Sequence, residues 1–460
     1  MPPTEFARVR RAALIVAPLV GLALAACQRN DTRVAASAPE HRAALPASPA
    51  VVFPLHVEAG KRYLVDAAGS PFFVNGDSPW DLISSLTQAE VDQYLEDRRL
   101  KGINTVLVEL MEHFFSPNPP KDVYGNAPFT TAGDFSTPNP AYFANVDYVL
   151  NKAAQKGILV MLTPAYVGYG GGQEGWYQEM TANGATKLFA YGQYLGNRYK
   201  SFNNIVWVQG GDYNVADKSL VQAVANGIRS VDSKPQSYHA VRGTAAMQFW
   251  GTGEPWLNLN SIYTDENTVV AAAFGEYNRS TAPFFLIEAR YENEGVGTEQ
   301  TVRLQAYQTV LSGGAGQLMG NNPIWWFRSG WQAALNSAGS RSLTQVSNLF
   351  STRAWWTLQP DTSNTTLTAG ASSGGDRAVA ARAANGSFAI GYMPTIRSIT
   401  IDMSKLAGPK VKAQWIDPTN GTAVPVSGSP FPNSGTRSMG PAANNASGYG
   451  DWVLLLESTP

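Results

Sequence analysis

Residues 204–212 read Asn-Ile-Val-Trp-Val-Gln-Gly-Gly-Asp, an apolar run rich in strand-forming residues that ends in two glycines and an acid. A second run, Pro-Phe-Phe-Leu-Ile-Glu at residues 283–288, also ends in a carboxylate. A (β/α)8 barrel carries its chemistry at the C-terminal ends of its strands, and cleavage of a glycosidic bond needs two carboxyl groups that face the bond. The two runs therefore make Asp212 and Glu288 candidate catalytic residues of such a barrel.

Eight runs of the chain have the composition of buried strands, and segments with helical spacing separate several of them. Strands are expected at residues 71–76, 103–110, 158–163, 204–209, 237–241, 259–263, 284–288 and 316–319. Helices are expected at residues 87–100, 146–156, 187–200 and 301–311, and the first opens with a capping box of Thr87 and Glu90. This alternation predicts an α/β fold, a (β/α)8 TIM barrel in which Asp212 ends strand four and Glu288 ends strand seven.

The pattern changes after Asp361. Residues 362–375 are rich in Ser, Thr and Gly and read as a linker, and short alternating runs follow at residues 377–383, 386–392, 398–403, 411–416 and 452–456. We therefore expect the barrel to span residues 51–361 and a small antiparallel β-sandwich to span residues 376–460. No constellation of acids or histidines occurs in the second segment, so we interpret it as an accessory domain that either packs on the barrel or contacts carbohydrate.

The N-terminal residues predict export and lipid anchoring. Three arginines precede the apolar stretch 12–26, which is too short for a stable membrane span, so residues 1–26 read as a signal peptide. Leu24-Ala-Ala-Cys27 resembles a bacterial lipobox, and Cys27 is the only cysteine of the chain. We expect lipid on Cys27, a flexible tether over residues 27–50, and anchoring to a bacterial membrane, on the periplasmic or surface side of the outer membrane. The alternative is an ordinary cleaved signal with an incidental cysteine.

Composition excludes several classes of function. Without residues 1–26, 31 basic and 34 acidic residues remain, which argues against nucleic-acid binding. The 12 Trp suit a protein that stacks aromatic rings on sugars, so an oligo- or polysaccharide is the expected partner. The four histidines, at positions 41, 56, 113 and 239, have no metal-ligand spacing, and no Gly-x-Ser-x-Gly elbow occurs. No metal and no cofactor is expected.

Several motifs together resemble one known family. They are Asn75-Gly-Asp-Ser-Pro-Trp80, Tyr194-Leu-Gly-Asn-Arg-Tyr199, residues 204–212, Glu288-Ala-Arg-Tyr-Glu292 and Gly320-Asn-Asn-Pro-Ile-Trp325. In this order they resemble the apiosidase-like glycoside hydrolases of family 140, and the C-terminal run resembles the domain that usually follows, which is named for collagen binding. The resemblance implies a barrel that releases apiose from a branched plant pectin, with Asp212 and Glu288 as its carboxylates. The family commonly has Gly-Glu-Pro-x-Tyr-Glu where this chain has Ile287-Glu-Ala-Arg-Tyr-Glu292, which leaves the sugar open.

The roles of the two acids have alternatives. By analogy with the large barrel clan of retaining glycosidases, Asp212 is expected to be the acid/base and Glu288 the nucleophile, although that clan normally has Asn-Glu on strand four. Asp212 could instead cap a helix that begins near Ala216. Glu292 is the alternative to Glu288, and Tyr291 either holds Glu288 ionised through its hydroxyl or belongs to the core.

The ends of the strands supply further candidate contacts to substrate. For each of them, packing or hydrogen bonding behind the site is the alternative role. These residues are Asp77, Trp80, Glu109, Glu112, His113, Tyr166, His239, Arg242, Tyr263, Asn321 and Trp325. The glycine-rich segment 167–176 lacks the Lys-Ser/Thr of a phosphate-binding loop and is expected to form a lid.

The resulting prediction is a lipid-anchored glycoside hydrolase that acts on a plant-type polysaccharide by a two-carboxylate mechanism. Two competing predictions remain. One is another exo- or endo-glycosidase for a plant or microbial glycan, and the other is a glycan-binding lipoprotein without catalysis, which the presence of both carboxylates disfavours.

Overall fold

The computed structural model describes residues 51–460. The predicted signal peptide, the lipidation site Cys27 and the tether lie outside the described residues. Within residues 51–460, no helix combines the length and the apolar character that crossing a membrane requires.

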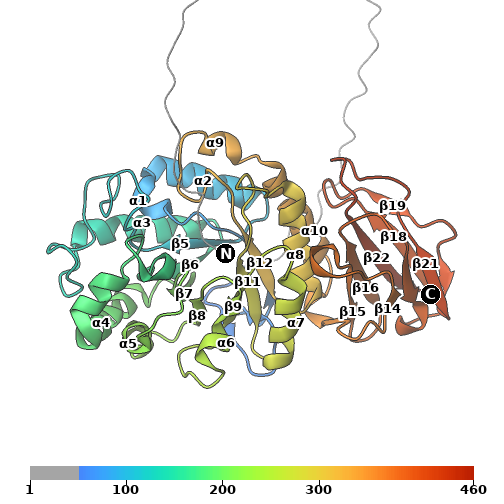
Figure 1. Ribbon diagram of the computed structural model, residues 1–460, viewed down its shortest axis with the longest axis horizontal. Helices are drawn as coiled ribbons and strands as arrows, with labels where there is room; N and C mark the ends of the chain where they lie inside the picture. Colours follow the sequence, from blue (N-terminus) through green and yellow to red (C-terminus); the bar gives the residue numbers. More distant parts are fainter. Residues whose placement is uncertain (1–50) are drawn as a thin grey trace, which may run out of the picture. The chain divides into compact units, whose positions relative to one another are not determined.

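Eight parallel strands form a barrel (Figure 1). They are β4 (Val74–Asp77), β5 (Thr105–Glu109), β6 (Leu159–Thr163), β7 (Ile205–Gly210), β8 (Gln236–His239), β10 (Asn260–Tyr263), β11 (Phe284–Glu288) and β12 (Gly316–Met319). Neighbouring strands pair with each other except at one seam, and β12 pairs with β4. Only the seam between β8 and β10 has no strand ladder; there Leu259 N–H donates to Gln236 O at 3.1 Å and Ser261 Oγ donates to Tyr238 O at 2.6 Å. The predicted TIM barrel is confirmed, strand for strand.

Three short strands that the sequence did not suggest, β1 (His56–Val57), β2 (Leu64–Val65) and β9 (Thr244–Ala245), accompany the barrel. Strand β9 pairs antiparallel with β10 and occupies the edge that the incomplete seam leaves. The first expected strand, residues 71–76, is divided: β3 (Pro71–Phe72) belongs to a small sheet with β1 and β2, and the barrel strand starts at Val74.

Helices cover the outside of the barrel. They are α1 (Leu82–Ser85), α2 (Gln88–Leu100), α3 (Pro140–Gln155), α4 (Tyr177–Tyr199), α5 (Lys218–Arg229), α6 (Ala246–Trp250), α7 (Val269–Arg279), α8 (Glu299–Leu311), α9 (Trp331–Ala334) and α10 (Ala338–Ser351). The expected capping box at Thr87 and Glu90 is present. Helix α3 begins earlier than expected because Asn139 caps it and Pro140 occupies its first turn. Helix α4 also begins earlier; its first turns precede Gly184, whose positive φ of 70° interrupts the helical spacing.

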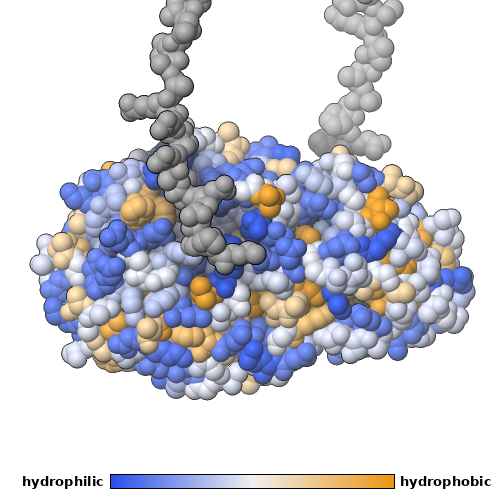
Figure 2. All heavy atoms as spheres, viewed as in Figure 1, coloured by the Kyte–Doolittle hydropathy of each residue, from blue (hydrophilic) through white to orange (hydrophobic). Residues whose placement is uncertain are grey.

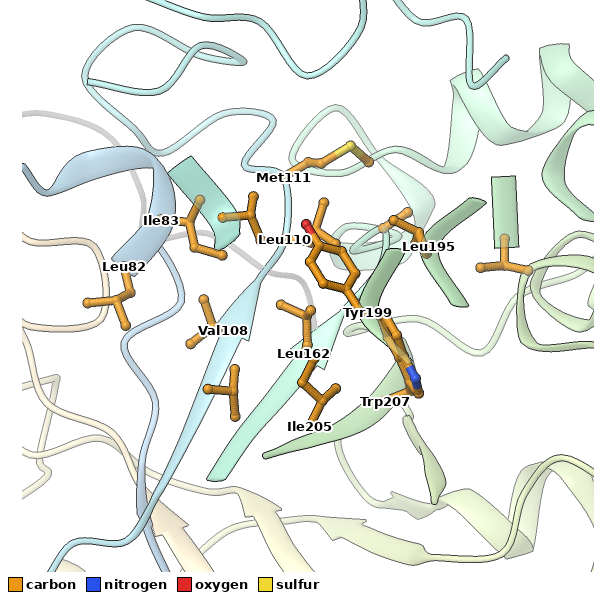
Figure 3. Packing of buried hydrophobic residues seen from close by; sticks show 14 of the residues in the cluster. Leu82, Ile83, Val108, Leu110, Met111, Leu162, Leu195, Tyr199, Ile205 and Trp207 are labelled. Atoms are coloured by element: carbon orange, nitrogen blue, oxygen red, sulfur yellow. The ribbon is translucent and has the colours of Figure 1, made fainter. Parts of the chain in front are cut away.

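The strands bury side chains on both faces. Leu107 and Val206 point into the barrel, while their neighbours Val108 and Trp207 pack outward against the helices. Figure 3 shows this outer layer, in which Leu162, Ile205 and Trp207 meet Leu195 and Tyr199 of α4. Burial on both faces explains why the strands read as continuous apolar runs.

The C-terminal part is an antiparallel β-sandwich, as predicted. Its larger sheet has the order β13 (Leu358–Pro360), β15 (Val379–Ala383), β16 (Phe388–Met393), β22 (Trp452–Thr459), β18 (Lys410–Ile416) and β19 (Ala423–Pro425), with β20 (Phe431–Pro432) also paired to β18. Its smaller sheet joins β14 (Leu367–Ala369), β17 (Ile399–Asp402) and β21 (Thr436–Met439). Residues of both sheets, such as Ile401 and Val411, share one core. The segment expected to be a linker, 362–375, differs from that expectation because it contributes β14, in which Leu367 and Ala369 pair with β17.

Buried contacts join the barrel to the β-sandwich. Arg303 of α8 forms an ion pair with Asp451 at 2.7 Å, and neither side chain is exposed to solvent. Tyr307 of α8 stacks on Tyr392 of β16 with ring centroids 5.0 Å apart. On the face of the molecule in Figure 2, hydrophobic residues form only small patches among hydrophilic ones. The face of the larger sheet that does not pack on the smaller sheet is covered by the barrel.

Candidate active site

The backbone after β7 aims Asp212 into the mouth of the barrel. Gly210 and Gly211 have φ values of 86° and 132°, and Asp212 itself has a φ of 42°. A Cβ on Gly211 would overlap the ring of Tyr166, so the double glycine is what allows this turn. A left-handed backbone at a residue other than glycine is strained and is common at functional sites. Helix α5 is capped by Asp217, so the interpretation of Asp212 as its cap is wrong.

His239 at the end of β8 connects the two acids. Its Nε2 lies 2.6 Å from Oε2 of Glu288, and its Nδ1 accepts the backbone N–H of Asp212 at 3.1 Å. Because a backbone N–H can only donate, Nδ1 carries no proton in this arrangement and Nε2–H donates to Glu288. Burial lowers the pKa of His239, but its hydrogen bond to Glu288 and the nearby charges outweigh burial and raise the pKa overall. A second proton, on Nδ1, would point at the N–H of Asp212. This repulsion opposes the charged, doubly protonated form of His239.

The environment of Asp212 favours its protonated form. Burial, followed by the charge of Glu288, raises the pKa of Asp212 to about 6. The hydroxyl of Tyr166 donates to Asp212 Oδ2 at 3.1 Å. Glu288, whose side chain is 12% exposed, accepts from His239 instead. The two carboxyl groups therefore differ in their surroundings, which is how one site separates an acid from a base.

One carboxylate oxygen of Asp212, one of Glu288 and one nitrogen of His239 all lie within 4.8 Å of one another. Such a set is also compatible with a metal ion. However, both nitrogens of His239 are already hydrogen-bonded, one to the Asp212 N–H and one to Glu288. The imidazole therefore offers no free lone pair, and its hydrogen-bonded role is the one that fits.

Aromatic side chains surround the two acids. Trp80 Nε1 donates to the Tyr291 hydroxyl at 2.8 Å, and the Trp80 ring packs on Tyr166 and His239 with centroids 5.7 and 5.5 Å away. The pKa of Tyr291 is raised by burial and then by the charge of Glu288. The Tyr291 hydroxyl thus binds Trp80, and the hydrogen bond that orients Glu288 comes from His239 instead.

An arginine hydrogen-bonded to a tyrosine borders the acids on the side of β10. Arg242 donates to the Tyr263 hydroxyl at 3.1 Å. Burial, followed by the charges of Glu288 and Asp212, raises the pKa of Tyr263 above its usual value. Glu294 also lies close enough for the charge of Glu288 to raise its pKa after burial. Glu294 was not predicted from the sequence, because it follows no strand end directly.

Other predicted contacts are engaged inside the protein. Asp77 is fully buried, forms an ion pair with Arg98 at 2.7 Å and accepts from Tyr94 at 2.6 Å. Glu292 accepts from Asn321 Nδ2 at 2.7 Å, from Ser337 Oγ at 2.6 Å and from Gly339 N–H at 2.7 Å. These bonds attach the segment after β11 to the start of α10 and leave Glu292 poorly placed to replace Glu288.

His113 also lies outside the pair of acids. Its two nitrogens contact Gln173 O at 2.9 Å and Glu179 at 3.0 Å, and its ring packs against Trp176. It thus fixes the glycine-rich segment 167–176 to α4. That segment also reaches the site, because Gly170 N–H donates to Asp212 O at 3.3 Å. Its role as a lid stays a prediction.

A group of buried carboxyl groups lies behind the site. Burial, followed by the charge of Glu112, raises the pKa of Glu109 well above its usual value, and the same causes raise that of Asp81. Glu112 accepts backbone N–H groups of Phe114 and Phe115, the latter at 2.6 Å. The sequence marked Glu109 and Glu112 as contacts but missed Asp81, which follows Trp80 directly.

Trp325 stands at the rim on the side of β12. Its ring stacks on Trp326 with centroids 4.6 Å apart and an interplanar angle of 6°. Phe115 meets it edge-on at 5.1 Å. Trp325 also packs against the cluster that contains Trp80 and Tyr263, so the structure brings it next to the site.

Comparisons with known proteins match two family models to the chain. Residues 58–357 match the family model described as "Apiosidase-like, catalytic domain", and residues 360–457 match the one described as "Putative collagen-binding domain of a collagenase". No curated protein matches the chain.

Solved structures share the fold. The chain is similar to a structure titled "Glycoside hydrolase" (TM-score 0.77, 24% identity, 88% of this chain and 97% of that chain). It is also similar to a glycoside hydrolase family 5 protein from Bacteroides vulgatus ATCC 8482 (TM-score 0.78, 24% identity, 89% and 95% covered). Both cover the barrel and the β-sandwich together.

Proposed function

The chain belongs to the apiosidase-like family of glycoside hydrolases, and from this premise we propose that it cleaves a plant-type polysaccharide by a two-carboxylate, retaining mechanism. The observation that carries the proposal is the pair Asp212 and Glu288, with one oxygen of each within 4.8 Å of the other. Carboxyl groups about 5 to 5.5 Å apart suit retention, whereas inverting enzymes separate them by about 6.5 to 9.5 Å to admit a water.

In this mechanism Asp212 is the general acid. Burial and the charge of Glu288 raise the pKa of Asp212 to about 6. Below that pH Asp212 carries a proton that it can donate to the leaving oxygen. Glu288 attacks the anomeric carbon from the opposite face, and a glycosyl ester forms as the C–O bond to the leaving group breaks. Asp212, now ionised, then takes a proton from a water that hydrolyses the ester, which restores both residues.

The surrounding residues have separate tasks in this proposal. His239 keeps Glu288 oriented through the 2.6 Å hydrogen bond, and Tyr166 does the same for Asp212. Trp80 packs on Tyr166 and His239, and Tyr263 packs on His239, so these rings form an aromatic wall beside the two acids. The family match favours release of apiose, while the replacement of Gly and Pro around Glu288 by Ile287 and Ala289 leaves room for a related sugar.

We also propose that the enzyme is exported and lipid-anchored to a bacterial membrane. This proposal depends on the sequence of residues 1–27 alone, where a short apolar stretch ends at the single cysteine.

A screen of plant and microbial polysaccharides with chromatographic product analysis tests the substrate. Proton NMR of the first product then reads the stereochemistry: retention of the anomeric configuration supports the proposal. Inversion would mean that one acid activates water, and no product from any polysaccharide would favour a glycan-binding protein without catalysis.

A further inference from the structure

A groove lies at the end of the barrel opposite the two acids. It has a volume of about 510 Å³ and is lined by residues 59–63, which precede β2, by Tyr277 and Gly314, and by residues 355–359. Gly314 stands two residues before β12 begins, whereas the catalytic candidates follow the other ends of the strands. The groove therefore lies at the N-terminal ends of the strands, where barrel enzymes do not place their chemistry.

Aromatic side chains give the groove surfaces suited to sugar rings. Trp356 is 40% exposed, although it is one of the largest apolar side chains of the protein. The buried Trp355 supports it edge-on, with centroids 6.3 Å apart and planes at 90°, and Tyr63 packs against Trp355 at 5.9 Å. A supported and partly exposed indole is the kind of surface on which the C–H face of a sugar packs.

The charged residues of the groove have one sign. Lys61 and Arg62 line it, and no acidic residue does. Arg62 lies over the Tyr277 ring at 3.8 Å and donates to Tyr277 O and Ser280 O, both at 2.9 Å, which fixes its position. Lys61 pairs only loosely with the exposed Glu58, at 3.5 Å, and such a surface pair contributes little. A ligand carboxylate could therefore replace Glu58 at small cost.

We propose that this groove is a second, non-catalytic binding site for an acidic glycan, whose rings pack on Trp356 and whose uronate groups face Lys61 and Arg62. The site goes beyond the proposed function, since the groove has no carboxyl pair and cannot cleave a glycosidic bond. It would hold the enzyme on a polymer while the opposite face of the barrel acts on it.

Affinity electrophoresis in native gels that contain polygalacturonate tests the proposal. Wild type should be retarded, and Trp356→Ala should bind about tenfold more weakly because a stacking surface is lost. Lys61→Gln should bind more weakly too, and salt should reduce the wild-type retardation. The matched control is Phe189→Ala on α4, a residue that is 37% exposed and outside the groove; it should bind like wild type.

A gel that contains neutral dextran distinguishes acidic from general glycan binding and should not retard the protein. Hydrolysis of a small soluble substrate should be unchanged in Trp356→Ala, while Glu288→Gln should bind polygalacturonate like wild type, which separates this site from the proposed catalysis. The proposal is overturned if wild type is not retarded by polygalacturonate, if Trp356→Ala binds as tightly as wild type, or if dextran retards the protein equally.

Discussion

His239 Nε2 lies 2.6 Å from Glu288 Oε2, while the other nitrogen of the same ring accepts the backbone N–H of Asp212. The buried imidazole of His239 thus fixes two groups: the carboxylate of Glu288 at the end of β11, and the strained turn at Asp212 after β7. The relative position of the two acids depends on this ring, because Asp212 and Glu288 belong to different strands that are far apart in the sequence.

Replacing His239 by Ala should therefore lower kcat about 100-fold, since a small misplacement of a reacting group has an effect of that size. Glu288 would lose the donor that orients it, and the turn at Asp212 would lose its acceptor. Steady-state kinetics measure the effect. The control is His113→Ala, because His113 contacts Gln173 and Glu179 rather than the acids. Equal kcat values for His239→Ala and wild type would refute the positioning role.

The raised pKa of Asp212, about 6, predicts how stability depends on pH. Below pH 3.8 the carboxyl is protonated in both folded and unfolded chains. Between pH 3.8 and 6 the folded chain binds more protons than the unfolded chain, so the free energy of unfolding falls as pH rises. At pH 7 Asp212→Asn should therefore be more stable by up to about 3 kcal/mol, and near pH 3.5 the difference should largely vanish. Thermal unfolding at both pH values checks this; a variant less stable than wild type at pH 7 would contradict it.

The ion pair between Arg303 and Asp451 should matter for the joint stability of barrel and β-sandwich. Asp451→Ala leaves a buried guanidinium without its carboxylate, and the free energy of unfolding should fall by about 3–5 kcal/mol. Glu457→Ala is the matched control, because its pair with Arg353 at 3.3 Å is partly exposed and should contribute less than about 1 kcal/mol. Denaturant titration compares the two, and similar effects would show that the buried pair is not special.

Cys27→Ala tests the proposed anchor. The variant should appear in the soluble fraction after cell disruption and should keep its activity, because the catalytic candidates belong to residues 51–460. Immunoblots of membrane and soluble fractions make the comparison. If the variant remained in the membrane fraction as wild type does, the lipid would not be the anchor.

The barrel was predictable because each of its strands is a local signal. A run such as residues 284–288 is buried on both faces, so its apolar composition marks it without any knowledge of its neighbours. The capping box at Thr87 is likewise a property of four adjacent residues. The strand β14 was missed because its three residues, inside a Ser- and Thr-rich segment, are ordered by pairing with a distant strand.

The site was predictable only in part, for the same reason. Strand ends could be located, and so Asp212, Glu288 and His239 were marked. Whether an acid at a strand end faces the barrel mouth or an internal partner depends on residues far along the chain. Asp77 is neutralised by Arg98, and Glu292 is enclosed by Ser337 and Gly339. The spacing of residues in the sequence carries no signal for these contacts.

The roles of the two acids can be tested most directly by kcat/KM of Asp212→Asn and Glu288→Gln on a dinitrophenyl glycoside of the sugar that the wild type releases. This leaving group needs no proton, so Asp212→Asn should retain far more activity on it than on the natural glycoside, where about 10²- to 10⁴-fold should be lost. Glu288→Gln should lose activity on both, because no glycosyl ester can form. A Glu288→Gln enzyme with near wild-type turnover would remove Glu288 from the mechanism.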